Sequence, residues 1–193
     1  MEEVTSLIDR LLGEDDQWAE LFGRIVNGKI EGDVNLSFSM SVLTELPDLS
    51  GITVSGDFTC THNKLTSLRG SPSRVGGSFD CDGNDLTSLE GAPTEVGGSF
   101  YCSVNKLTSL QGSPVSVGGH FFCQYNELTS LEGAPASVGG DLRCYSNSLT
   151  SLRGMPIVHG EVYCDSNPHF SDDDINQAKA DNAKSAMSRL LSI

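Results

Sequence analysis

The cysteines of this chain recur at an almost constant interval, and that interval constrains the fold more than any other feature of the sequence. The six are Cys60, Cys81, Cys102, Cys123, Cys144 and Cys164, which are 21 residues apart except for a last step of 20. An asparagine follows each of them three residues later: Asn63, Asn84, Asn105, Asn126, Asn147 and Asn167. A fixed interval of this size indicates a solenoid, in which each repeat forms one coil that stacks on the last.

The letters that the repeats share, F-x-C-x-x-N-x-L-T-S-L, predict how one coil is built. Phe79 and Cys81 are two positions apart, so a strand would point both of them inward. Asn84 would end the strand, and Leu86 and Leu89 would turn back beneath it. We expect the stacked strands to form a parallel sheet, with loops that carry the G-x-P-x-x-V-G-G stretch on the other side. The proline would hold an extended backbone there, and the glycine pair would permit a sharp return into the next strand.

A less regular copy of the repeat precedes the first cysteine and brings the expected number of coils to about seven. Its inward positions are assigned to Leu36, Phe38, Ser41, Leu43 and Leu46, which lie 22 residues ahead of the next copy. The solenoid is therefore expected to span residues 34–167.

This pattern resembles leucine-rich repeats, whose core reads L-x-L-x-x-N-x-L, with Phe and Cys here in the first two inward positions. The short interval and the N-x-L-T-S-L-x-G-x-P tail resemble the subclass found in secreted bacterial effectors. The L-T-S-L-E-G-A-P repeats of uncharacterised tailed-bacteriophage proteins are the most similar. The resemblance covers residues 34–167 and implies an α/β solenoid with a concave parallel sheet. It also implies a phage protein that binds a host protein, such as one of antiviral defence, in the host cytoplasm.

Helices are expected to cover both ends of the stack. Residues 1–33 are expected to form a helical hairpin, because apolar residues recur at helical spacing in two segments, the second ended by Asn27-Gly28. The two sets are Val4, Leu7, Ile8, Leu11 and Leu12, then Trp18, Leu21, Phe22, Ile25 and Val26. Residues 168–193 are expected to form a C-terminal capping helix that begins at Ser171. Its apolar positions are Ile175, Ala178, Met187, Leu190 and Leu191.

The cysteines and asparagines are interpreted as structural. All six cysteines occupy the same inward slot, where each acts as a small apolar side chain, and no C-x-x-C pair or Cys/His cluster has the spacing of zinc ligands. The asparagines would bond the backbone of adjacent coils. No Ser/His/Asp or Cys/His set and no phosphate-binding loop can be found. We therefore expect no metal, no cofactor and no enzymatic activity.

The positions that flank the inward residues differ from coil to coil and are expected to face outward on the concave side. In the middle coils they collect aromatic rings beside a histidine and an arginine. The candidate protein-binding residues are Tyr101, His120, Phe122, Gln124, Tyr125, Arg143, Tyr145 and Tyr163. Exposed aromatic residues with charged neighbours are typical of protein-binding hot spots. The alternative is that the rings only stack on one another and stabilise the sheet.

The charge of the chain narrows the classes of partner. With 26 acidic against 12 basic residues and a net charge of −14, direct binding to nucleic acid or to an anionic membrane is not expected. No apolar run could span a bilayer and no secretory signal is present, so we expect a cytoplasmic protein. The expected function is non-enzymatic binding of a protein that has a basic rim around an apolar pocket, by a monomer or weak homo-oligomer. Two alternatives remain: an acidic mimic of nucleic acid that occupies a basic cleft, and a structural protein that assembles with itself.

Overall fold

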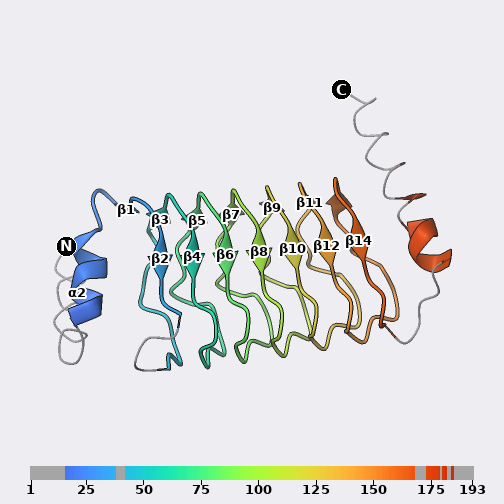
Figure 1. The fold of residues 1–193 in the computed structure, drawn as a ribbon, viewed down its shortest axis with the longest axis horizontal. Coiled ribbons are helices and arrows are strands. Elements are labelled where there is room, and N and C mark those ends of the chain that lie inside the picture. The colour runs from blue at the N-terminus through green and yellow to red at the C-terminus, as the bar shows by residue number, and fades with distance from the viewer. Residues whose placement is uncertain (1–15, 38–41, 168–172, 179, 182–183, 185–193) are drawn as a thin grey trace.

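The coils stack into a parallel β-solenoid with two sheets. The computed structural model describes residues 16–37, 42–167, 173–178, 180, 181 and 184 (Figure 1). Sheet A has seven parallel strands in the order β1-β3-β5-β7-β9-β11-β13, and sheet B has seven in the order β14-β12-β10-β8-β6-β4-β2. Each coil therefore contributes one strand to each sheet, and every strand pairs with the equivalent strands of the coils next to it.

All the strands are two residues long. Sheet A consists of β1 (Lys29–Ile30), β3 (Thr53–Val54), β5 (Arg74–Val75), β7 (Glu95–Val96), β9 (Ser116–Val117), β11 (Ser137–Val138) and β13 (Ile157–Val158). Sheet B consists of β2 (Val34–Asn35), β4 (Phe58–Thr59), β6 (Phe79–Asp80), β8 (Phe100–Tyr101), β10 (Phe121–Phe122), β12 (Leu142–Arg143) and β14 (Val162–Tyr163).

Sheet A lies where the sequence predicted only loops. Its strands come from the V-G-G part of the repeat, and the valine at this position points inward: Val75 is 2% exposed and Val96 is 4% exposed. A β-branched residue suits such a half-buried strand. The backbone beside it pairs with the adjacent coils, as in the pairing of Val75 with Val54 and Val96. The expectation of a single sheet was therefore wrong.

The core is built from identical side chains stacked at each step. The rings of Phe58, Phe79, Phe100 and Phe121 are stacked, with centroids 5.2 to 5.6 Å apart and interplanar angles of 5° to 18°. All six cysteines are buried free thiols, which confirms their role as packing groups. Burial raises the pKa of the Cys60, Cys81, Cys102 and Cys123 thiols, to about 12 for Cys123, so these four stay protonated and unreactive at neutral pH.

The asparagine ladder forms as predicted. The Asn84 side chain donates from Nδ2 to the carbonyl oxygens of Cys60 and Cys81, both at 3.0 Å, and its Oδ1 accepts the Leu65 N–H at 3.1 Å. One amide thus satisfies backbone groups of two successive coils at the bend.

The first coil is two residues out of the register that the sequence predicted. Val34 pairs with Phe58 and Leu36 takes the slot of Cys60, where its carbonyl accepts from Asn63 at 3.0 Å. A slip of two residues keeps the same side chains facing inward, so alternation along a strand cannot detect it. Leu43 keeps its predicted place, since its N–H bonds Asn63 Oδ1 at 2.9 Å. Of the other three assigned positions, Leu46 is buried, and Phe38 and Ser41 lie outside the described residues.

Only short helices flank the sheets in the described parts of the chain. One is α2 (Asp16–Gly23), and residues 173–178 are also helical. These parts are mostly sheet, so neither the α/β class nor the two helical caps is confirmed. The first predicted helix, the Trp18 side chain, and Ser171, Met187, Leu190 and Leu191 lie outside what the structure describes.

The second predicted helix ends earlier than expected. Leu21 and Phe22 are buried, but Val26 is 65% exposed. Asn27 and Gly28 have φ of 51° and 74°, which fits a two-residue hairpin turn that joins Val26 to Lys29. The Asn-Gly pair therefore leads the chain into sheet A and does not end the helix.

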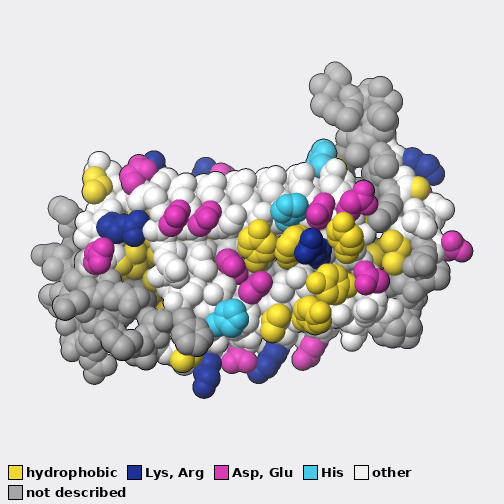
Figure 2. Space-filling view, viewed as in Figure 1, with side chains coloured by type: hydrophobic (Ala, Val, Ile, Leu, Met, Phe, Trp, Pro, Cys, Tyr) yellow, Lys and Arg dark blue, Asp and Glu magenta, His cyan; other side chains and the backbone are white. Residues whose placement is uncertain are grey.

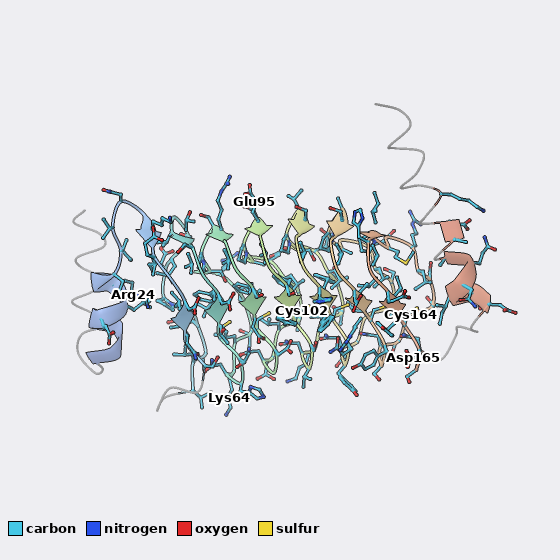
Figure 3. The ribbon with its side chains drawn as sticks, turned by 45° about the horizontal axis from the view of Figure 1, so that its top comes forward. Arg24, Lys64, Glu95, Cys102, Cys164 and Asp165 are labelled. Carbon is cyan, nitrogen blue, oxygen red and sulfur yellow. The ribbon has the colours of Figure 1, made fainter. Side chains whose placement is uncertain are left out.

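A single arginine covers the open edge of the first coil. The Arg24 side chain, which lies between α2 and the stack, donates from Nη2 to the carbonyl oxygens of Glu31 at 2.9 Å and Asp33 at 2.7 Å (Figure 3). These carbonyls have no preceding coil to supply a donor, and the guanidinium takes that place. Among the described residues, no helix has the length and apolar character needed to cross a membrane.

Candidate functional site

The candidate residues lie on the outer face of sheet B, which we call the sheet-B face. Strand register places Asp80 beside Tyr101, Tyr101 beside Phe122, Phe122 beside Arg143, and Arg143 beside Tyr163, in one row across five strands. Figure 2 shows hydrophobic side chains gathered over this part of the sheet with acidic side chains around them. The stack runs nearly straight in Figures 1 and 3, and neither view shows the concave curvature that was expected.

The rings of this row touch one another and hold a cation. Tyr101 and Phe122 pack edge to face with centroids 5.3 Å apart. The guanidinium carbon of Arg143 lies 4.3 Å from the ring centroid of Phe122 and 5.5 Å from that of Tyr163. These distances are within the range of a cation–π interaction. The rings of Phe122 and Tyr163 therefore both lie close to the positive charge of Arg143.

A second group of candidate residues lies where the strands end. Tyr125, 54% exposed, packs edge to face on Tyr145 at 5.4 Å between centroids. Gln124 is half-buried, and its Oε1 is shielded from solvent with no hydrogen-bond partner among the described residues. The second group thus lies in the segments that follow β10 and β12, whereas the row lies in the strands themselves. The eighth predicted residue, His120, packs beside Phe122 with ring centroids 5.3 Å apart.

His120 has a structural task that the sequence did not reveal. Its Nδ1 accepts the backbone N–H of Asp141 at 2.9 Å, so this nitrogen carries no proton and its 3.5 Å contact with the Asp141 carboxylate is not an ion pair in that state. In other coils the side chain at the equivalent position also accepts a backbone N–H from the next coil. Asp57 accepts from Ser78 N, Ser78 from Ser99 N, Ser99 from His120 N, and Asp141 from Glu161 N. This column was expected to vary freely, but it requires a hydrogen-bond acceptor.

The slot before each ladder asparagine has a left-handed backbone. Its φ is 54° at Val104 and 56° at Tyr125, and a glycine, Gly83, occupies it in the coil before Val104 at 69°. A β-branched or bulky residue is disfavoured in this region, with a cost of order 1 kcal/mol. Val104 is nevertheless present and 56% exposed. Val104 was not among the residues predicted from the sequence, although an apolar residue in a slot that suits glycine was the available signal.

Two carboxylates crowd the N-terminal side of the rings. Burial raises the pKa of Asp82 to about 6, and repulsion by Asp80 adds to this, while the hydrogen bond from the Ser103 N–H opposes it. Burial also raises the pKa of Asp80, against the bond from the Asp82 N–H. Because burial and repulsion disfavour the charged form, ionisation of Asp82 at neutral pH has a cost to the folded state.

This crowding predicts that Asp82→Asn stabilises the protein, and more at pH 7 than at pH 4. Because the folded pKa of Asp82 lies above its unfolded value, its ionisation lowers stability as pH rises from about 4 through 6. Asparagine removes the charge and keeps an oxygen for Ser103. After allowance for solvent screening we expect a gain of about 1–2 kcal/mol at pH 7 and almost none at pH 4, measured by urea unfolding. Glu90→Gln, an exposed control, should change stability by less than about 0.5 kcal/mol; an equal gain for Asp82→Asn at both pH values would contradict the prediction.

The described residues contain no group of three or more His, Cys, Asp or Glu side chains placed to hold a metal ion. A hollow on the turn side, lined by Leu46, Gly70, Ser71 and Pro72, contains none of the candidate residues. Comparisons of the chain with family models, with curated proteins and with solved structures give no match.

Proposed function

We propose that this protein is a non-enzymatic binding module that captures a protein partner on the sheet-B face. The observation that carries the proposal is the row formed by Tyr101, Phe122, Arg143 and Tyr163. The equivalent positions in earlier coils are Asn35, Thr59 and Asp80, and those coils pair in the same way. A coil therefore forms without an aromatic ring in this slot. Tyr101 and Phe122 are half-buried and Tyr163 is exposed. Solvent-accessible aromatic residues that the fold does not require are typical of binding anchors.

The resemblance to repeat proteins of tailed phages suggests that the partner is a bacterial host protein, met in the host cytoplasm. We expect Phe122→Ala with Tyr145→Ala to abolish capture of a partner from bacterial lysate. Truncating a hot-spot ring costs about 2 kcal/mol or more, or roughly 30-fold in affinity for each. The measurement is a pull-down with purified wild type and variant, followed by titration of the captured protein.

The matched control is Val42→Ala with Val115→Ala, which truncates two exposed apolar side chains outside sheet B. It should capture the partner as wild type does. Equal capture by the Phe122/Tyr145 variant would contradict the assignment of this face. Steep loss of affinity with salt and competition by DNA would instead indicate a nucleic-acid mimic. Large particles in light scattering would indicate self-assembly.

A further inference from the structure

The charges on the sheet-B face have an order along the solenoid axis. Asp80 and Asp82 lie on the N-terminal side of the rings. On the C-terminal side three acids accompany one arginine: Asp141, Glu161 and Asp165, with Arg143. The formal charge is therefore −2 on each side of an aromatic centre. A partner that matches this face must carry positive charge at two places with apolar groups between them.

The N-terminal pair lacks a neutralising cation. Among the described residues, neither Asp80 nor Asp82 forms an ion pair with lysine or arginine. Each carboxylate accepts a backbone N–H, from Asp82 and Ser103 respectively, which fixes its position. A cation brought here would relieve a repulsion that is already present in the free protein.

The C-terminal side shows how the face holds a cation. Arg143 lies over Phe122 and beside Tyr163, with three acids on the same and the next coil. It demonstrates within the chain that the ring faces of this surface hold a guanidinium. The remaining rings, Tyr101, Tyr125 and Tyr145, offer similar chemistry to a side chain from outside.

The spacing of the two acidic groups limits the length of a bound segment. β6 and β14 are four strand steps apart in sheet B. At about 4.8 Å for each step, the separation is about 19 Å, which an extended peptide crosses in about six residues at roughly 3.3 Å each. The strands are only two residues long, so a bound segment can contact the acids, the rings and the second group of acids in turn only if it runs along the solenoid axis.

We infer that the sheet-B face binds an extended segment of a partner protein that carries basic residues about six positions apart on either side of an apolar centre. This inference rests on the proposed function and names the chemistry of the partner. A second copy of this chain would bring its own acids against these, and nucleic acid or an anionic membrane would be repelled.

The test is selection of peptides from a random twelve-residue display library on the full-length protein. Selected peptides are then synthesised and titrated against wild type and three variants. Asp80→Asn with Asp82→Asn removes two charges from the face, and is expected to be at least as stable as wild type. Glu45→Gln with Glu90→Gln removes two charges from exposed residues of the turn side. Phe122→Ala with Tyr145→Ala removes two rings.

We expect selected peptides with Lys or Arg on both sides of an apolar centre. Their affinity should fall about tenfold or more for the Asp80/Asp82 variant and less than about twofold for the Glu45/Glu90 variant. Peptides that need the rings but show no basic residues, or bind both charge variants equally, would overturn this inference and leave the proposed function standing. Failure to select any peptide that depends on Phe122 and Tyr145 would contradict both.

Discussion

Gly98→Ala is expected to destabilise the protein by at least about 3 kcal/mol, although it adds only one methyl group. A Cβ at this position would lie 2.7 Å from the carbonyl carbon of Gly77, 2.7 Å from Ser78 Oγ and 2.8 Å from Ser78 N, all in the preceding coil. Two of these atoms belong to the backbone and cannot move aside unless the coils separate. Separation would lengthen the Gly98 N–H bond to Gly77 O, 2.8 Å in the folded state, and the strand pairing on either side.

Gly51→Ala is the matched control, because a Cβ there would have no atom within 4 Å. It should change stability by no more than about 0.5 kcal/mol. Urea unfolding followed by circular dichroism measures both. Similar stability of the two variants would show that the coils are not held as closely as the structure indicates.

The glycine pair was visible in the sequence, but its structural role was not. Its recurrence was visible, and it was assigned to a sharp turn. The structure gives a different reason: the second glycine of the pair lies close to the acceptor side chain of the coil before, so that a Cβ added at Gly140 would lie only 2.7 Å from His120 Nδ1. A contact between coils involves residues about twenty positions apart, so local turn propensities do not reveal it.

The solenoid was predictable because every coil buries the same side chains in the same slots. Phe100, Cys102, Leu107 and Leu110 are each 0% exposed, as the shared letters of the repeat indicated. The second sheet was not predicted, since one inward valine in each repeat gives too short an alternation to identify a strand. Pairing between coils supplies the hydrogen bonds that a two-residue strand cannot form alone.

The candidate face was predictable from variation between coils, but the roles of its residues were not. Variation correctly grouped Tyr101, Phe122 and Arg143, which lie side by side. It also placed His120 among free contact residues, although His120 supplies a structural acceptor. Only hydrogen-bond geometry separates the two cases, because aspartate, serine and histidine share an acceptor and little else.

Asn147→Ala is expected to cost about 3 kcal/mol, since one side chain serves several backbone groups in a buried bend. Its Nδ2 donates to the carbonyl oxygens of Cys123 at 3.0 Å and Cys144 at 3.1 Å, and its Oδ1 accepts the Leu128 N–H at 3.0 Å. Asn147 is 7% exposed, so water cannot readily replace these bonds. A buried backbone group left unpaired costs about 1–3 kcal/mol.

Asn35→Ala is the matched control, because it removes an asparagine that does not belong to the ladder. The Asn35 side chain is exposed, and its Oδ1 accepts a single local bond, from Ser37 N at 2.9 Å. Its removal should cost less than about 1 kcal/mol. Asn147→Asp should be at least as damaging as Asn147→Ala, because the carboxylate keeps the acceptor, loses both donors and places a charge in the bend. If Asn147→Asp unfolded at the wild-type urea concentration, the carbonyls of Cys123 and Cys144 would not need the ladder, and the coils would be joined by their sheets and core alone.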